Sequence, residues 1–515
     1  MYGEGILVAR TGLRAADAGT STAAATRRGP VVAALMLAMG LVALDSTVVA
    51  TAVPQIVGDL GGFAYFSWLF SGYLLAVTVT LPVYGKLSDT FGRKPVLVAG
   101  AVLFLLGSLL SGLAWDMGSL IAFRVVQGLG GGALQGTVQT LAADLFPLRE
   151  RPRIQARLST VWAMSAVAGP GVGGLLAAYA GWRWIFLVNL PVGALALWMI
   201  VRHLREPRTA AADAAARPPV DWAGALAIFA CGGVLLTALV QGGVAWPWLS
   251  APSLLLFGAG LVLAALVVVI ERRAADPVIP GWVWRRRTIA AVNLSLGAMG
   301  LLMVAPTVFL PTYAQGVLGL EPVAAGFVMS VWTLTWPVSA ALSQHLYRRI
   351  GFRDTGLVGI GVTALALGAF QLLPYPGSVW QPVLLMAVVG AGLGLFSAPL
   401  LVGVQSTVGW SERGTTTASV LFCRQTGQTV GASLFGAVAN GVLASRLGGG
   451  DLDAVTRALD SGAGVPEATG RALAAATQAV YLGAAVAAVV AFVVLLTLAP
   501  RRFPVLATSA EAPGE

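Results

Sequence analysis

Apolar runs of membrane length recur along the whole chain, and they constrain its fold more than any other feature. A run of about 20 apolar residues can cross a hydrocarbon core of roughly 30 Å as a helix, which satisfies its own backbone hydrogen bonds there. Of the 515 residues, 57% are hydrophobic and only 10% are charged, whereas soluble domains carry about 25% charged residues. The sequence therefore predicts an all-α integral membrane protein.

The runs fall into three groups of six, two and six, which predicts 14 spans. They lie near 31–56, 67–84, 96–114, 119–143, 157–180 and 183–201, then 221–241 and 252–270, then 289–312, 323–345, 355–374, 380–402, 415–443 and 477–499. Glycines recur 262 residues apart in the two outer groups, as at Gly128 and Gly390, which favours two related halves. The predicted division is a disordered cytosolic tail 1–30, a six-helix bundle 31–205, an inserted helix pair with its loops 206–288, a second six-helix bundle 289–500 and a cytosolic tail 501–515. We expect the inserted pair at the periphery.

Basic residues in alternate loops predict the topology. Arginines or lysines occupy the loop before the first run and every second loop after it, whereas loops such as 57–66, 242–251 and 375–379 carry almost none. Short cytoplasmic loops hold the Lys and Arg residues of membrane proteins. Both termini are thus expected in the cytoplasm of a cell with this chain in its inner (plasma) membrane, and the polar segment 446–476 outside. The same loops explain the net charge of +10, so nucleic acid is not an expected partner.

Several kinds of catalytic and metal site find no support in the sequence. No phosphate-binding G-x-x-x-x-G-K-[ST] motif occurs, and both lysines lie in one loop. The two histidines, His203 and His345, lie at the ends of runs, and the two cysteines, Cys231 and Cys423, lie far apart inside runs. We therefore expect no enzyme, no metal, no cofactor and no ATP-driven pump, and a gradient as the energy source.

Several short motifs carry a family resemblance. They are GKLSDTFGRKP (85–95), RVVQGLGGG from Arg124, GPGVGG (169–174), LDSTVVATAVPQI (44–56), WRWIFLVNLPVG (182–193) and RQTGQTVG (424–431). Together they resemble the major facilitator superfamily, and within it the fourteen-span drug:proton antiporter family. The resemblance implies the major facilitator fold, with two six-helix bundles that alternate access to a central cavity. It departs from the family at Ser165, where another glycine is usual.

The resemblance also implies two conformational elements. The loop motif 85–95 predicts a latch at the cytosolic side, in which Asp89 caps a helix end or pairs across the two halves and Arg93 binds Asp144. Its members are Gly85, Asp89, Gly92, Arg93, Lys94 and Asp144. The antiporter motif associated with export consists of Gly169, Pro170, Gly173 and Gly174, for which ordinary small-residue packing is an equal alternative.

Asp45 and Arg124 are the predicted proton-coupling residues. Asp45 lies halfway along the first run, and an ionisable residue at that depth is costly enough to suggest a function. Arg124 lies at a comparable depth in the fourth run and cannot give up its proton, so it would pair with the acid. A structural pair that fixes helix register is the alternative.

The candidate substrate cavity combines residues of both halves. Its predicted members are Gln127, Trp332, Trp336, Arg424 and Gln428. The two tryptophans, four residues apart on one helix face, could line an aromatic cavity or provide lipid-facing bulk. Arg424 could serve substrate binding, coupling or helix packing.

These observations predict a monomeric, proton-coupled exporter of lipophilic small molecules, with protons and membrane lipids as its other partners. Export of an endogenous lipid, siderophore or self-made antibiotic is the alternative within transport. A membrane receptor that keeps the fold without transport is the alternative from another class.

Overall fold

The computed structural model describes residues 29–61, 66–204, 221–242, 246–375, 377–447 and 466–506. Within these ranges the chain is almost entirely helical, and its only β interaction is a single bridge between Gly242 and Trp246. The all-α fold class is thus confirmed. Most of the predicted tail 1–30, residues 205–220 of the predicted cytosolic loop, the centre of the segment 446–476 and the end of the tail 501–515 lie outside the described residues.

The N-terminal block carries the first six predicted runs. It comprises the first span Gly29–Val48, η1 (Val49–Ala52), α2 (Val53–Leu60), α3 (Phe66–Phe91), α4 (Arg93–Gly112), α5 (Met117–Leu145), α6 (Arg151–Tyr179), α7 (Arg183–Leu187) and α8 (Asn189–His203). A single residue, Gly92, joins α3 to α4 with a φ of +96°, a conformation that residues with a side chain rarely adopt. We call this end of the molecule the hairpin end.

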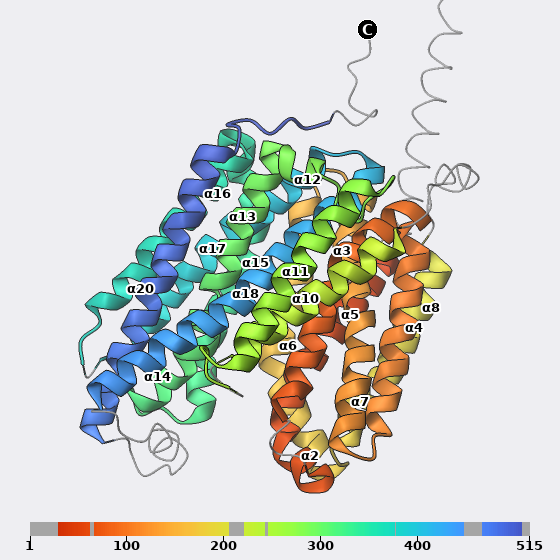
Figure 1. Ribbon diagram of the computed structural model, residues 1–515. Helices are drawn as coiled ribbons and strands as arrows, with labels where there is room; N and C mark the ends of the chain where they lie inside the picture. Colours follow the sequence, from red (N-terminus) through yellow and green to blue (C-terminus); the bar gives the residue numbers. More distant parts are fainter. Residues whose placement is uncertain are drawn as a thin grey trace, which may run out of the picture.

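The inserted pair and the C-terminal block follow (Figure 1). The inserted pair is α10 (Trp222–Gln241) and α11 (Ala251–Arg273). The C-terminal block comprises α12 (Trp282–Arg285), α13 (Arg287–Leu302), η4 (Ala305–Phe309), α14 (Leu310–Gly316), α15 (Pro322–Ile350), α16 (Phe352–Gly368), η5 (Ala369–Leu372), α17 (Trp380–Ser406), α18 (Trp410–Arg446) and α20 (Glu467–Leu498).

The described residues contain 12 helices that are long and apolar enough to cross a membrane, or 13 if the bent helix α6 is one span. The predicted run 415–443 forms part of α18, a helix of 37 residues. This helix is not among the candidate spans, because uncharged polar residues such as Gln428, Thr429 and Ser433, together with Arg424, lower its mean hydropathy. The multi-pass architecture is confirmed, and the count of fourteen spans stays a prediction.

The two blocks meet mainly where α3 packs on α18 and where α6 packs on α15, with smaller contacts of α5 with α18 and of α6 with α17. The inserted pair lies over the first of these seams, because α10 contacts both α3 and α18 (Figure 1). In α11, only 11% of the apolar stretch is buried inside the protein. In α10 the buried share is 33%, because this helix covers the seam and buries apolar surface against both α3 and α18.

Candidate functional site

Asp45 lies at the centre of a buried polar cluster in the N-terminal block. Asp45 is 2% exposed, and its two carboxylate oxygens accept hydrogen bonds from different donors. Arg124 Nη1 donates to Oδ2 at 2.5 Å, and Gln127 Nε2 donates to Oδ1 at 2.9 Å. Arg124 and Gln127 are three residues apart on α5 and so share a face, where Arg124 also donates to Gln127 Oε1 at 2.8 Å. The predicted pair of Asp45 and Arg124 is present.

Asn189 is a member of this cluster that the sequence analysis missed. Its Nδ2 donates to Asp45 Oδ1 at 3.1 Å and to Ser108 Oγ at 3.0 Å. Ser108 in turn donates to the backbone carbonyl of Phe186 at 2.8 Å. Asn189 is the first residue of α8, directly after the break that follows α7. Its signal in the sequence is a polar amide inside the apolar motif 182–193.

Arg124 is also held by helix α3. Its Nε donates to the backbone carbonyl of Leu69 at 3.4 Å, and its guanidinium lies 4.2 Å from the centre of the Tyr73 ring. Such a cation–π contact in a desolvated place is worth up to about 2 kcal/mol. The Tyr73 hydroxyl is buried and has no hydrogen-bond partner among the described residues. The Arg124 guanidinium therefore contacts both the Asp45 carboxylate and helix α3.

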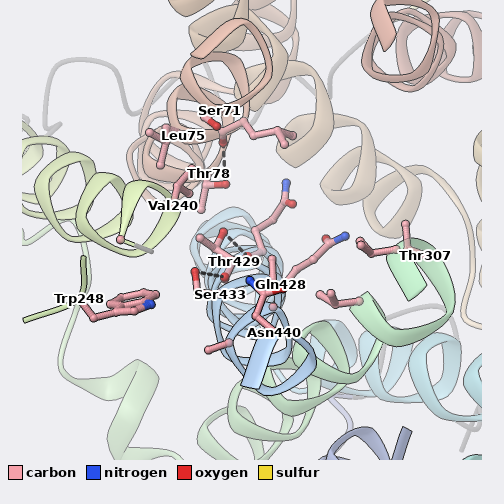
Figure 2. Close-up of a pocket in the computed structure, with 18 residues that line it drawn as sticks. Ser71, Leu75, Thr78, Val240, Trp248, Thr307, Gln428, Thr429, Ser433 and Asn440 are labelled. Atoms are coloured by element: carbon pink, nitrogen blue, oxygen red, sulfur yellow. Dashed lines mark hydrogen bonds between the residues drawn. The ribbon is translucent and has the colours of Figure 1, made fainter. Parts of the chain in front are cut away.

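A pocket of about 440 Å³ lies between the two blocks (Figure 2). Its volume falls in the range of about 300–1,000 Å³ that small-molecule sites occupy. Helices α3 and α18 supply most of its lining, and η4, the end of α10 and the residue Trp248 complete it. Of the predicted cavity residues, Gln428 lines this pocket, whereas Gln127, Trp332, Trp336 and Arg424 do not.

The structure places those four residues elsewhere. Gln127 belongs to the Asp45 cluster. Trp332 is 4% exposed in the core of the C-terminal block, so the expectation of lipid-facing bulk is wrong for it. Trp336 lies beside it, with ring centres 5.9 Å apart, and donates to Ser397 Oγ at 3.1 Å.

Arg424 is half-buried near the middle of α18. Within the described part of the chain it makes no ion pair and no side-chain hydrogen bond. The next residue, Gln425, lines the pocket and donates to Gln135 Oε1 of the N-terminal block at 3.2 Å. Arg424 is thus next to a pocket-lining residue in the sequence but does not line the pocket itself, and no carboxylate pairs with it among the described residues.

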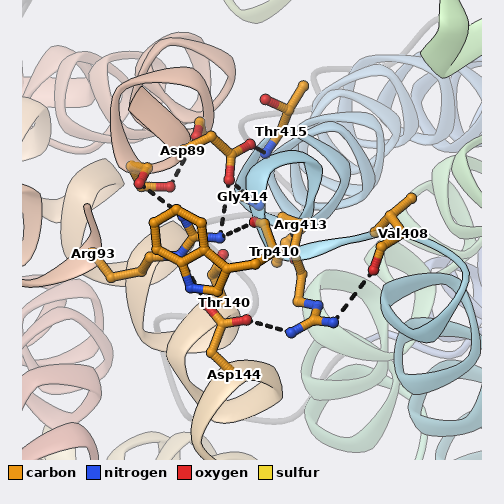
Figure 3. A network of polar contacts seen from close by, with 12 residues as sticks. Asp89, Arg93, Thr140, Asp144, Val408, Trp410, Arg413, Gly414 and Thr415 are labelled. Atoms are coloured by element: carbon orange, nitrogen blue, oxygen red, sulfur yellow. Dashed lines mark hydrogen bonds and ion pairs between the residues drawn. The ribbon is translucent and has the colours of Figure 1, made fainter. Parts of the chain in front are cut away.

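Asp89 joins the two blocks at the hairpin end (Figure 3). Its carboxylate accepts the backbone N–H groups of Gly414 at 2.8 Å and Thr415 at 2.7 Å, both in the first turns of α18. It also pairs with Arg93 at 3.0 Å. Gly414 and Thr415 are the fifth and sixth residues of α18, so the carboxylate lies near the positive end of the helix dipole. Asp89 thus pairs across the two halves, one of its two predicted roles, but it binds the second turn of α18 and does not cap the first.

Arg93 and Asp144 complete the same network. Arg93 Nε donates to Asp144 Oδ2 at 2.8 Å, so the predicted contact is present. Arg93 Nη2 donates to the backbone carbonyl of Trp410 at 2.5 Å. The Arg93 guanidinium also lies 3.7 Å from the centre of the Trp410 indole ring. The second oxygen of Asp144 pairs with Arg413 of α18, which the sequence analysis missed. One aspartate thus binds arginines of both blocks.

The other predicted latch residues differ in what they contact. Gly85 lies against α18, where a Cβ atom would come within 2.4 Å of the Ala418 Cβ. Lys94 instead donates to the carbonyls of Val201 at 2.9 Å and Leu204 at 2.8 Å, at the end of α8. Gly85 therefore belongs to the contact between the blocks, whereas these two bonds of Lys94 lie within the N-terminal block.

The antiporter motif lies against the first span, close to Asp45. A Cβ atom on Gly169 would lie 2.1 Å from Thr47 Oγ1, and Thr47 donates to the backbone carbonyl of Ser165 at 3.0 Å. Helix α6 bends by 42° between Arg151–Gly169 and Gly171–Ala177. Gly173 is buried, whereas Gly174 has open space around it. Gly169 is thus closely packed and the helix bends at this motif, whereas the association of the motif with export stays a prediction.

Comparison with known proteins identifies the class to which this fold and site belong. The sequence model of the Major Facilitator Superfamily matches residues 35–432, and the chain belongs to this superfamily of transporters. It is 33% identical over 431 residues to "Multidrug resistance protein 3" of Bacillus subtilis (strain 168), which covers 83% of each chain. It is 32% identical over 417 residues to "Multidrug transporter protein MdtP" of the same organism, covering 81% of this chain and 76% of the relative.

The fold is also found among solved structures. The crystal structure of the human organic anion transporter MFSD10 superposes with a TM-score of 0.61 at 15% identity, covering 91% of this chain and 99% of that one. At this identity the likeness shows the fold alone. The family match and the two relatives in Bacillus subtilis indicate a transporter rather than an enzyme.

Proposed function

We propose that the protein is a proton-coupled exporter of lipophilic small molecules, which works by alternating access between its two blocks. The observation that carries this proposal is the buried Asp45 carboxylate, held by Arg124, Gln127 and Asn189. When such an enclosed carboxylate takes up a proton, it loses its charge, and its attraction to Arg124 weakens. Uptake and release of one proton can therefore change the bonds within this cluster. The names of the two relatives in Bacillus subtilis support efflux of small molecules.

Helix α3 connects the parts that such a mechanism requires. Near its start, Leu69 and Tyr73 contact Arg124. Ser71, in the same turn, and Thr78, nearer the middle of the helix, line the pocket. At its end, Asp89 holds α18. A shift of Arg124 after protonation of Asp45 would thus reach the pocket and the latch through one rigid element.

The conformation described here is closed at the hairpin end. Among the described residues, the hydrogen bonds between the two blocks lie at that end or near the middle, from the Gln425–Gln135 bond to the Asp89 and Arg413 contacts. By the distribution of arginines in the loops, the hairpin end faces the cytoplasm of a cell with the protein in its inner membrane. The pocket would then exchange its contents with the outside, as the releasing state of an exporter must.

Proton entry supplies the required energy. One charge that moves through about 100 mV yields roughly 2.3 kcal/mol, to which a pH difference adds. The test is uptake of a fluorescent drug into inside-out vesicles under an imposed pH difference. We expect Asp45→Asn, which keeps the shape of the side chain, to abolish uptake against a gradient. Uphill uptake by that variant would disprove the role of Asp45.

Asp59→Asn provides the matched control. Asp59 is an exposed carboxylate of the same block, paired with Arg183 at 2.9 Å, and it lies in α2. Its replacement removes one negative charge without touching the Asp45 cluster. We expect this variant to transport like the wild type, and equal loss in both variants would argue against a specific role for Asp45.

A further inference from the structure

The pocket has a third wall that belongs to neither six-helix bundle. Val240 near the end of α10, Gly242 directly after this helix, and Trp248 line it together with α3 and α18. Figure 2 shows Trp248 on the side of the pocket opposite Thr307. A hydrogen bond fastens this wall, since Ser433 of α18 donates to the backbone carbonyl of Leu239 at 2.6 Å.

Trp248 is seated by its neighbours in a defined position. Its ring lies directly over Gly242, where a Cβ atom would come within 2.6 Å of the ring. On another side it stacks on Phe257 of α11, with ring centres 6.5 Å apart and an interplanar angle of 23°. A side chain larger than glycine at position 242 would displace the ring. The sequence thus makes room for an aromatic surface beside the pocket.

The chemistry of the lining selects the charge of a ligand. None of the described residues that line the pocket is ionisable, and its polar groups are hydroxyls and amides, such as Thr78, Gln428 and Asn440. Asp45 is enclosed by its own donors and is not among the residues that line the pocket. A cation would therefore be desolvated without a counter-charge, which is costly. An uncharged molecule would not incur that cost.

We infer that the inserted helix pair is part of the substrate site, and that Trp248 is a specificity-determining residue for uncharged aromatic substrates. The inference rests on the proposed function and narrows its substrate class. Stacking on an aromatic side chain contributes about 0.5–1.5 kcal/mol, which corresponds to roughly a two- to tenfold change in affinity. The inserted pair thus influences which substrates bind, because Trp248 beside it lines the pocket.

Binding to the purified full-length protein tests this inference without any need for transport. The probes are tritiated chloramphenicol, which is uncharged and aromatic, and tritiated tetraphenylphosphonium, which is a cation of similar bulk. We expect saturable binding of chloramphenicol, at least tenfold weaker binding of tetraphenylphosphonium, and a two- to tenfold loss of chloramphenicol affinity in Trp248→Ala. Trp248→Phe should keep most of the affinity, because it keeps an aromatic surface.

Trp380→Ala is the matched control, since Trp380 is 72% exposed at the start of α17 and does not line the pocket. Equal affinity of wild type and Trp248→Ala, tighter binding of tetraphenylphosphonium, or no saturable binding of chloramphenicol would each overturn the inference. Failure of the proposed function has a different signature, because binding would then persist while a pH difference drives no uptake into vesicles.

Discussion

The Asp89 carboxylate accepts the backbone N–H of Gly414 at 2.8 Å, although 325 residues separate the two in sequence. The bond joins the end of α3 to the start of α18 and so closes the hairpin end. Both carboxylate oxygens take part, because the second accepts from Thr415. Closure of this end therefore depends on a group with two acceptors at position 89.

Asp89→Asn is expected to weaken the closed state and slow transport. An amide has one oxygen, so one of the two N–H groups of α18 loses its acceptor, and the pair with Arg93 is lost. A hydrogen bond to a charged group contributes about 1.5–3 kcal/mol. The measurement is maleimide labelling from the hairpin side at Gln139→Cys, in a protein in which Cys231 and Cys423 are alanine. Labelling should rise severalfold in Asp89→Asn.

Lys86→Gln is the control for that experiment. Lys86 belongs to the same motif, 85–95, and lies in α3. It pairs with Asp276, in the loop after α11. Its loss leaves the contacts of Asp89 with α18 in place, so labelling at position 139 should stay at the wild-type level. Unchanged labelling in Asp89→Asn, with normal efflux, would show that the motif 85–95 indicates the topology but does not hold the hairpin end closed.

Gly85→Ala is expected to hold the hairpin end open by steric overlap. The added methyl would lie 2.4 Å from the Ala418 Cβ and 2.9 Å from the Gly414 carbonyl oxygen, so α3 and α18 must separate. Overpacking of this kind costs about 1–3 kcal/mol. Transport should fall and labelling at position 139 should rise, whereas Gly368→Ala, which has open space around it, should behave as the wild type. Normal transport by Gly85→Ala would show that this contact is not required.

Arg93→Gln is expected to destabilise the protein more than Arg413→Gln. Both arginines pair with Asp144, but the Arg93 side chain is 1% exposed and that of Arg413 is 16% exposed. Loss of a buried partner leaves an uncompensated charge, at a cost of about 3–5 kcal/mol. Thermal unfolding in detergent should rank Arg93→Gln lowest, then Arg413→Gln, then wild type. The reverse order would mean that burial of the arginine does not determine how much stability is lost.

Features with a strong local signal could be predicted from the sequence. Apolar runs of membrane length predicted the helices, because the bilayer imposes their length. Buried charges were equally visible, since Asp45 and Arg124 stand out in an apolar sequence, and the motif at 85–95 marked Asp89 and Arg93. In each case the residue type alone is unusual for its surroundings.

Features that depend on which helices meet could not be predicted. Trp332 is buried only because α15 packs inside the C-terminal block, and sequence spacing does not show that packing. Arg413 reaches Asp144 across 269 residues. The place of Trp248 depends on α10 crossing the seam between α3 and α18. These are relationships between elements, and no local pattern encodes them.

Asn189→Ala is expected to impair coupling more than Ser108→Ala. Asn189 donates to both Asp45 and Ser108, so its loss removes a bond to the carboxylate, worth about 1.5–3 kcal/mol. Ser108→Ala removes only a second neighbour, and the bonds of Asp45 to Arg124, Gln127 and Asn189 can persist. Two assays in vesicles separate a positioning role from a structural one: uptake driven by a pH difference, and exchange of labelled for unlabelled substrate without one. Asn189→Ala should lose driven uptake but keep exchange, whereas Ser108→Ala should keep both. Loss of both activities in Asn189→Ala, with a matching fall in unfolding temperature, would instead make Asn189 a structural residue of the α7–α8 break.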